Sequence, residues 1–397
     1  MLKNKKRNVL VSVITLLYIS CQNNHKAINL HITTNDTKEI KIDTTAIPLK
    51  ISTIIDSISY IKLKSTPIPI SKIDKIITTD KEIFILDRII SKALFVFDKN
   101  GYFKYAVNKK SASVIASDFT LDSAGKYVYV YYPSLHSINT YNANDGTEIK
   151  DKSIDIKGYF DKLSMPDDST FLLLRDGISY FKKDPNEYDQ NRACFFSITG
   201  RYLGGCINNA LFKNINYGTV HYQNNSSKGI NVNRLYSDTI FSFSRIKFKA
   251  VYKLNFIGNN IDSNFYNSTS SRAADLYLRS KKISFLWGDF FESSNNILFY
   301  YTTGGRIFTY VLRKNANQTY LVSYFINDID NIMDIGVIKQ VIGDNLISSV
   351  SASSIINLYR SFQTSHMDPA KYKKLFSLRD GLTNYSNPII AIMHLKK

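Results

Sequence analysis

A short hairpin pattern recurs along the chain, and its spacing limits the folds that the sequence can adopt. In FVFDKNGYFKY, which begins at Phe95, residues of high strand propensity flank the turn Asn100-Gly101. Such a turn between such arms is a strong hairpin signal, because both of its central residues can need a positive φ. Similar turns follow at Asp145-Gly146, at Thr199-Gly200 and, without glycine, near Arg245, at intervals of about 45 to 54 residues. A repeat of this length predicts the blades of a β-propeller.

The repeat can be followed through six units of about four strands each. Abundant Tyr and Phe, 27 and 24 residues, favour strands over helices. We therefore predict an all-β fold, a six-bladed β-propeller over residues 48–397; a pair of β-sandwich domains is the alternative, which the regular spacing disfavours. The units begin at Ile73, Ala116, Phe160, Thr219, Phe285 and Met333.

Three further segments complete this prediction. The strand Ser57–Leu63 precedes the first unit, and we expect it to close the ring by pairing with Ile389–Leu395. Two short helical insertions are predicted. One lies in DSNFYNSTSSRAADLYLRSKK, and the other begins at Asp368-Pro369, where Asp is a good N-cap and Pro suits the first helical position.

The N-terminus has the organisation of a signal peptide over residues 1–20. A basic segment, Lys3–Arg7, precedes an apolar stretch, Val9–Ile19, that is too short to span a bilayer. The following Ser20-Cys21 resembles a bacterial lipobox, which implies that Cys21 becomes the lipidated first residue of the mature protein. An ordinary secretory signal with an incidental cysteine is the alternative.

Residues 21–47 are rich in Asn, Thr and Lys, and we predict that they form a polar tether between the lipid and the domain. The protein would then lie in the cell envelope, on a periplasmic or outer-membrane face, and not in the cytoplasm. Its contact with the membrane would be the N-terminal lipid.

Several stretches resemble the six-bladed β-propeller lipoproteins common in Bacteroidetes, relatives of the NHL-type propellers. The resemblance covers nearly the whole chain and implies an exported, lipid-anchored propeller in a family mostly without assigned activity. Members often carry a glycine-rich loop after the first hairpin, where this chain has VNKKSASVIASDF. The matching stretches are DSISYIKL, IDKIITTDKEIFILDRIISKALFVFDKNG, LYSDTIFSF, YKLNF, NDIDN and NPIIAIMHLKK.

The net charge of +18 bears on the partners. The lysines form no long run, so we interpret them as a solvating surface and expect no nucleic-acid partner. The alternative is that the basic surface binds a polyanionic glycan or an anionic membrane surface. We expect a monomer.

No motif in the sequence indicates a particular enzymatic reaction. The six histidines form no HxH or HxxxH pair, and no nucleophile elbow, P-loop or dinucleotide fingerprint is present. Catalytic residues are thus unknown, and neither a cofactor nor a metal is predicted. Asp328, Asp330 and Asp334 in NDIDNIMD are weak candidates for a cation site, although the central glycine and terminal glutamate of a calcium loop are missing. A polar turn between blades is the alternative.

Cys194 and Cys206 flank the hairpin CFFSITGRYLGGC and are candidates for a disulfide, because an exported protein meets oxidising conditions. A turn centred on Thr199-Gly200 puts Cys194 opposite Gly204 and leaves Cys206 at a diagonal position, about 7–8 Å away at Cα. A bulge would shift this register by one residue and could bring the thiols closer or turn them apart. Two buried, unbridged cysteines are the alternative.

Two classes of function remain open. The absence of catalytic motifs favours a binding or scaffold module for a peptide, glycan or partner protein at the envelope. The alternative is a propeller enzyme of the metal-dependent lactonase or lyase type, which would need acidic or His side chains converging in the central channel.

Overall fold

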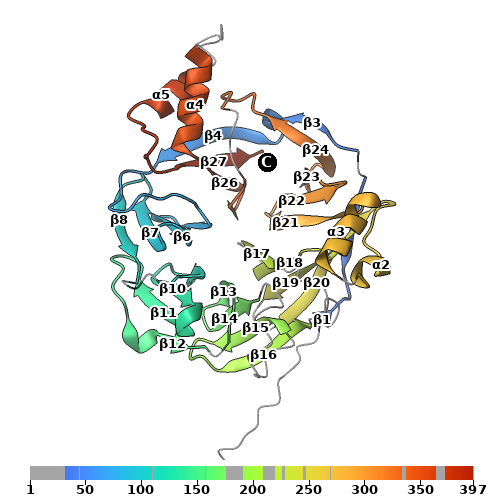
Figure 1. The fold of residues 1–397 in the computed structure, drawn as a ribbon, viewed down its shortest axis with the longest axis horizontal. Coiled ribbons are helices and arrows are strands. Elements are labelled where there is room, and N and C mark those ends of the chain that lie inside the picture. The colour runs from blue at the N-terminus through green and yellow to red at the C-terminus, as the bar shows by residue number, and fades with distance from the viewer. Residues whose placement is uncertain are drawn as a thin grey trace, which may run out of the picture.

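The ring predicted from the hairpin repeat is present in the computed structural model (Figure 1). Six small sheets surround a central channel, and we number them as blades 1 to 6 along the chain. The fold is thus a six-bladed β-propeller with two helical insertions. The structure describes residues 32–396 except for residues 44, 110, 112, 157, 176–190, 209–219, 226–228, 245–246, 269, 333–336 and 364–371.

Each blade is an antiparallel meander that runs from the channel to the rim. Blade 1 comprises β5 (Lys75–Thr78), β6 (Glu82–Asp87), β7 (Ala93–Asp98) and β8 (Phe103–Val107). Blade 2 comprises β9 (Asp118–Leu121), β10 (Tyr127–Tyr132), β11 (Ser137–Asn142) and β12 (Ile154–Asp155). Blade 3 comprises β13 (Lys162–Asp167), β14 (Thr170–Leu174), β15 (Asn191–Ser197) and β16 (Tyr202–Asn208).

The second half of the ring repeats this order. Blade 4 comprises β17 (Val220–Asn225), β18 (Gly229–Arg234), β19 (Thr239–Ser244) and β20 (Lys247–Phe256). Blade 5 comprises β21 (Ser284–Glu292), β22 (Asn296–Thr303), β23 (Arg306–Arg313) and β24 (Gln318–Ile326). Blade 6 comprises β25 (Gln340–Ile342), β26 (Asn345–Val350), β27 (Ile389–Leu395) and β4 (Ile55–Lys62).

Blade 6 closes the ring with strands from both ends of the chain. β4 pairs with β27 in antiparallel register, for example Ile61 with Ile390 and Ser57 with His394. The prediction that Ser57–Leu63 completes the last blade is therefore confirmed. Short 3₁₀ turns among the described residues are η1 (Ile51–Thr53), η2 (Pro133–Leu135) and η3 (Lys150–Lys152).

The predicted tether of residues 21–47 is wrong from residue 32 onward. β1 (Ile32–Thr33) and β2 (Lys38–Ile42) pair in parallel with β20, and β3 (Ile47–Lys50) pairs in parallel with β24. The reason is burial, because Ile40 and Ile42 enter the core between blades 4 and 5. The ordered domain therefore begins before residue 48, and residues 21–31 lie outside the described residues.

Both helical insertions are present. The first forms α2 (Ser263–Tyr266) and α3 (Ser271–Ser280), and the Asp262 carboxylate caps α2 by accepting bonds from two backbone N–H groups. The second holds α4 (Ala352–Gln363), which the sequence analysis missed, and α5 (Lys373–Arg379). The predicted helix start at Asp368-Pro369 lies outside the described residues.

The core consists of six apolar layers between neighbouring blades. In β6, Phe84 and Leu86 face blade 2, whereas Ile83 and Ile85 face blade 6. Because both faces of the strand are buried, its sequence is almost continuously apolar. Each fully buried side chain of this size contributes about 1.5–3 kcal/mol.

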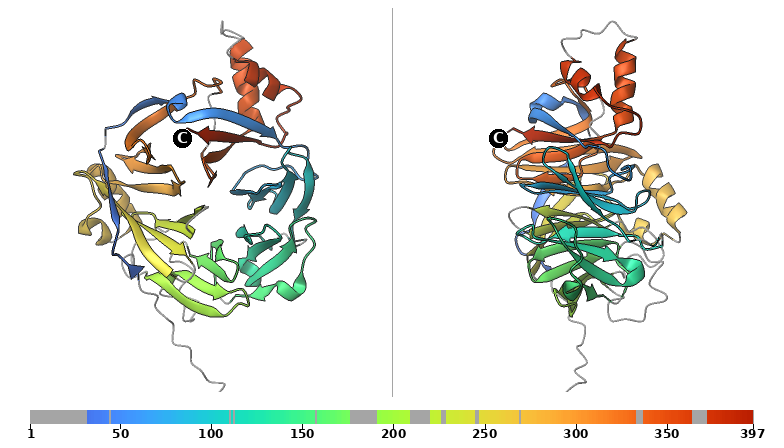
Figure 2. Two further views of the ribbon diagram at one scale, coloured as in Figure 1. Left: turned by 180° about the vertical axis from the view of Figure 1, so that it is seen from behind. Right: turned by 90° about the vertical axis from the view of Figure 1, so that its left-hand side faces the viewer.

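The two faces of the ring differ. One face, which we call the turn face, carries short turns such as those between β5 and β6 and between β25 and β26. The opposite face, the loop face, carries the connections between blades and, by the antiparallel topology, the starts of both helical insertions. The side view in Figure 2 shows the α2–α3 insertion on the side away from the C-terminus, which lies at the turn face. No helix among the described residues is both long and apolar enough to cross a membrane.

Candidate functional site

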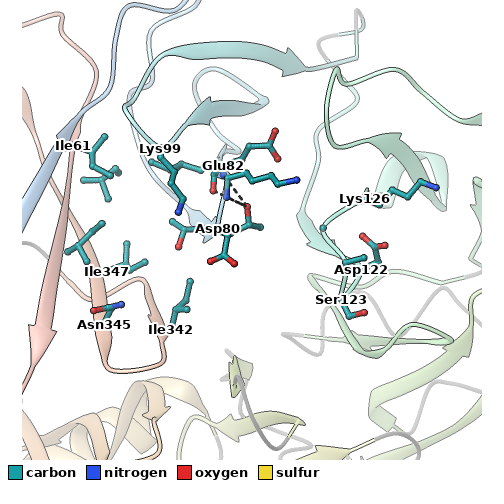
Figure 3. Close-up of a pocket in the computed structure, with 18 of the residues that line it drawn as sticks. Ile61, Asp80, Glu82, Lys99, Asp122, Ser123, Lys126, Ile342, Asn345 and Ile347 are labelled. Carbon is teal, nitrogen blue, oxygen red and sulfur yellow. Dashed lines mark hydrogen bonds between the residues drawn. The ribbon is translucent and has the colours of Figure 1, made fainter. Parts of the chain in front are cut away.

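One candidate site is a groove of about 1020 Å³ on the turn face, where blade 6 meets blades 1 and 2 (Figure 3). We call it the seam groove, because it lies beside the junction that closes the ring. Blade 6 contributes one wall, and the β5–β6 and β9–β10 turns contribute the other. In Figure 3, Ile61, Ile342 and Ile347 stand on one side, facing Asp80 and Lys99.

The floor of the seam groove is aliphatic. Isoleucines from four strands of blade 6 and from β6 meet there. Ile61, Ile342 and Ile392 are half-buried, and the other three are buried beneath them. Aliphatic surface that stays in contact with water is a source of binding free energy, at roughly 25 cal/mol per Å² covered. The floor residues are Ile61, Ile83, Ile342, Ile347, Ile390 and Ile392.

The rim of the groove carries charges of both signs. Lys81, Lys99 and Lys126 are exposed, and Asp80 and Asp122 stand among them. Glu82 also lines the groove and is paired with Lys104. An apolar floor inside a charged rim is the usual composition of a binding interface.

The rim turns are held in place by hydrogen bonds. Asp122 accepts a bond from the Tyr127 N–H at 2.8 Å. The next turn residue, Ser123, donates its hydroxyl at 2.5 Å and its N–H at 2.8 Å to Asp168 of blade 3. These two bonds, the hydroxyl bond first, lower the pKa of the Asp168 carboxyl. At the outer end, the Lys64 N–H donates to the Gly101 carbonyl at 2.8 Å. The groove is therefore largely pre-formed.

A second candidate lies at the loop-face end of the channel, where the inner strands begin. Lys75, the first residue of β5, pairs with Asp118, the first residue of β9, at 2.9 Å. The Lys75 ammonium also donates to the carbonyls of Phe119 at 2.6 Å and Leu163 at 3.4 Å. Lys75 thus joins blades 1, 2 and 3 around the channel.

Lys339, which directly precedes β25, is the second cation there. Burial is the main cause that lowers its pKa; Lys72 and Lys162 lower it further, while Asp289 and Asp74 oppose the shift. Burial likewise lowers the pKa of Lys75, against the opposing effect of Asp118. We call Lys72, Asp74, Lys75, Asp118, Lys162, Asp289 and Lys339 the channel cluster.

The acidic residues proposed from NDIDNIMD lie in the connection between β24 and β25. Asp328 accepts bonds from the Ser52 N–H at 3.0 Å and the Ser52 hydroxyl at 2.7 Å. Asp330 accepts from the Tyr60 hydroxyl at 2.7 Å, and its negative charge adds to burial in raising the Tyr60 pKa. Both carboxylates thus tie this turn to the N-terminal strands, and Asp334 lies outside the described residues.

The two cysteines of blade 3 are not bridged. A bulge beside Phe196 shifts the register, so that Cys194 lies opposite Gly205 and Ala193 lies opposite Cys206. Successive residues point to opposite faces of a sheet, so the thiols face different blades: Cys194 packs against blade 2 and Cys206 against blade 4. The alternative of two buried, unbridged cysteines is the one observed.

Sequence reasoning missed both candidate sites. Within the described residues, no group of three or more His, Cys, Asp or Glu side chains is placed to hold a metal ion. The residues that do converge are lysines and isoleucines, which carry no motif. Cys21 lies outside the described residues.

Comparison with one solved structure supports the propeller fold. A crystal structure of a Bacteroides fragilis protein described as exported has a TM-score of 0.72 and 16% identity, covering 91% of this chain and 100% of that one. Hydrazine synthase of Kuenenia stuttgartiensis gives 0.42 and 13%, covering 83% and 88%, and a protein of unknown function from Bacteroides caccae gives 0.40 and 9%, covering 63% and 81%. No curated protein matches the sequence. One family model, described as a domain of unknown function, DUF4934, matches residues 32–394. The chain therefore belongs to the DUF4934 family.

Proposed function

We propose that this protein is an exported binding module of the cell envelope that holds an extended peptide segment of a partner protein in the seam groove. The observation that carries the proposal is the aliphatic, half-buried floor within a pre-formed, charged rim. Pockets of this composition supply affinity through the floor and orientation through the rim.

A peptide fits the groove better than a glycan does. Sugar rings bind by stacking on aromatic faces, which carry a polar tip or edge beside a flat apolar surface. Among the described lining residues there is no Phe, Tyr or Trp, whereas six are isoleucine. Aliphatic side chains of a peptide would cover this floor, and rim groups such as Lys81 and Asp80 could pair with charges on either side of it.

Export and lipid attachment belong to the same proposal. The apolar core before Ser20-Cys21 and the similarity to a protein described as exported support a location outside the cytoplasm. Changing Cys21 to Ser should release the protein from the membrane fraction while its melting temperature stays unchanged. A variant that remains with the membranes would contradict lipid attachment at Cys21.

The groove is tested with displayed peptide libraries. Peptides selected on the wild-type protein should be rich in aliphatic residues and should bind Ile342→Asp at least tenfold more weakly, because a carboxylate would lie on the floor. The matched control is Ile89→Asp on the loop face, where the side chain is 62% exposed, and its affinity should be unchanged. Equal loss in both variants, or no loss in Ile342→Asp, would contradict the assignment of the groove.

The enzyme alternative gains no support from the described residues. The channel cluster offers cations and paired carboxylates, but no set of three ligands around one point. The binding function is therefore the one that we carry forward.

A further inference from the structure

A second cavity lies where the α4–α5 insertion rejoins blade 6. Its volume is about 540 Å³, within the range of about 300–1,000 Å³ that is typical of ligand pockets. One wall comes from the chain that leaves β4, residues 62–66 and 69, and the other comes from the segment 380–387 after α5. Figure 1 shows α4 and α5 beside β4. We call this cavity the insertion pocket.

Hydrogen bonds fix both walls of the insertion pocket. The Lys62 ammonium donates to the carbonyls of Ser377 at 2.7 Å and Asp380 at 3.0 Å, which joins β4 to the end of α5. The buried Asn387 amide donates to the Lys64 carbonyl at 2.7 Å, which joins the two walls to each other. The pocket is therefore pre-formed, so a ligand would bind without first having to order the chain.

Tyr385 supplies an aromatic surface to this pocket. It is 88% exposed, more than any other large apolar side chain among the described residues. Its backbone is nevertheless fixed, because the Tyr385 N–H donates to the Thr383 hydroxyl at 3.3 Å and the Thr383 N–H donates to the Ser386 hydroxyl at 2.9 Å. A single exposed apolar side chain is ordinary on a protein surface. An aromatic ring on the wall of a pre-formed polar cavity, however, offers a flat apolar face on which a ligand can stack.

The other groups that line the insertion pocket are mostly polar. Lys64 and Asp380 are exposed and carry opposite charges, and within the described ranges neither side chain forms an ion pair. Ser65 and Ser386 add hydroxyl groups. Hydrogen-bond donors and acceptors beside an aromatic face match a sugar, because a sugar ring has an apolar C–H face and hydroxyls that both donate and accept. The seam groove, with its six isoleucines, has the opposite composition.

We propose that the insertion pocket binds a sugar unit of a neutral oligosaccharide, stacked on the Tyr385 ring. The Asp380 carboxylate would accept hydrogen bonds from the sugar hydroxyls, and the Lys64 ammonium would donate to them, which gives charge-assisted bonds. The Asp380 carboxylate would repel a phosphate or a carboxylate, so a neutral ligand suits the pocket better than an anion. This inference goes beyond the peptide binding proposed for the seam groove and does not depend on it.

Isothermal titration of the full-length protein tests the pocket, in a detergent without a sugar headgroup so that the detergent does not compete. The probes are maltotriose, cellotriose and the trimer of N-acetylglucosamine. We expect saturable binding of at least one probe at one equivalent, with an affinity that added sodium chloride does not change, because the ligand is neutral. No saturable binding of any probe up to about 10 mM would overturn the proposal, and so would loss of binding in salt.

Variants of Tyr385 locate the binding and separate stacking from hydrogen bonding. Tyr385→Ala should weaken the bound probe at least about tenfold, whereas Tyr385→Phe keeps the ring and should stay within about threefold of the wild type. The melting temperature of Tyr385→Ala should be unchanged, because the residue is 88% exposed. The matched control is Tyr324→Ala on β24, where the residue is 60% exposed, and its affinity should equal that of the wild type. Unchanged affinity in Tyr385→Ala, or an equal loss in Tyr385→Phe, would overturn the proposal.

Two further variants separate this site from the seam groove. Asp380→Asn should weaken sugar binding without lowering the melting temperature, because it removes the charge of an exposed acceptor. Ile342→Asp, which should abolish peptide binding in the seam groove, should leave sugar binding unchanged. The peptide proposal and the sugar proposal can therefore fail independently, and a loss of sugar binding in Ile342→Asp would contradict the insertion pocket as the site.

Discussion

Changing Asn387 to Ala should weaken the closure of the ring more than the size of the change suggests. Asn387 precedes β27, and its side chain is 5% exposed. Its amide nitrogen donates to the Lys64 carbonyl at 2.7 Å and to the Thr66 hydroxyl at 3.1 Å. Its amide oxygen accepts from the Ile70 N–H at 3.0 Å. One side chain thus joins the last strand of the chain to the segment that enters blade 1.

The cost of the change follows from the groups that lose their partners. The Ile70 N–H is buried, so leaving it unsatisfied costs about 1–3 kcal/mol. Lys64 is exposed, so its carbonyl can turn to water and only the net value of a hydrogen bond, about 0.5–1.5 kcal/mol, is lost. Thr66 retains its bond to the Ile68 carbonyl at 2.7 Å. We expect a loss of about 2–4 kcal/mol in the free energy of unfolding.

Scanning calorimetry measures this loss. An unfolding entropy of about 2.1 cal/mol/K per residue gives about 0.8 kcal/mol/K for a domain of this length, so the melting temperature should fall by about 3–5 °C. The matched control is Asn315→Ala, because Asn315 makes its bond to Asn295 on an exposed turn and the change should stay within about 0.5 kcal/mol. A fall for Asn387→Ala no larger than that of the control would refute the reasoning.

The remaining predictions concern the closure of the ring, the Asp87 carboxylate and the thiols of Cys194 and Cys206. Truncation before Pro388 removes β27, so far-ultraviolet circular dichroism and thermal melting should show loss of the cooperative transition, and an unchanged melting temperature would contradict closure by this strand. Gly101→Ala should cost at least about 2 kcal/mol in urea unfolding, because Gly101 has φ +82° and a Cβ there would lie 2.4 Å from the Lys62 carbonyl. Burial alone would raise the pKa of Asp87, but bonds from Ser71, Ser91, Lys72 and Ile90 lower it overall. The stabilisation by the Asp87 carboxylate is therefore present above the unfolded pKa of about 3.9 and is lost as pH falls through the lower folded value. Asp87→Asn should lower the free energy of unfolding at pH 7 and flatten the acid limb of the stability profile. Thiol titration of the denatured, lipidated protein without reductant should find both Cys194 and Cys206 reactive, and a count near zero would contradict the observed register.

The hairpin repeat predicted the blades because it is a local signal. A turn such as Asn100-Gly101 and its two arms lie within a dozen residues, and burial on both faces makes the arms apolar. Closure by β4 and β27 could be predicted as well, since an unpaired strand and an incomplete blade were left at opposite ends of the chain. These inferences needed no knowledge of long-range geometry.

The N-terminal strands β1–β3 escaped prediction for a physical reason. They pair in parallel with outer strands more than 200 residues away, so no turn marks them. The segment KEIKI does alternate, and its buried Ile40 and Ile42 are the signal that could have revealed β2. For α4, Ile355, Ile356 and Phe362 stand on one buried face at helical spacing, and this periodicity was available in the sequence.

The bulge beside Phe196 shows where sequence reasoning stops. One inserted residue decides whether Cys194 and Cys206 share a face, and both registers were compatible with the turn at Thr199-Gly200. The bulge depends on how blade 3 packs between its two neighbours, which the sequence of the hairpin does not contain.

The channel lysines were hidden in a different way. Lys75 and Lys162 are each the first residue of an inner strand, and Lys339 directly precedes one. These lysines are far apart along the chain, so their equivalence is not visible in the linear sequence. When the six blade sequences are aligned with one another, the three lysines fall at nearly the same position of the repeat. In a propeller that place lies at one end of the channel, and there the Lys75 ammonium contacts Asp118 of blade 2 and the Leu163 carbonyl of blade 3. Comparing equivalent positions among blades, rather than searching for motifs along the chain, is therefore the way in which a channel site can be found from the sequence of such a ring.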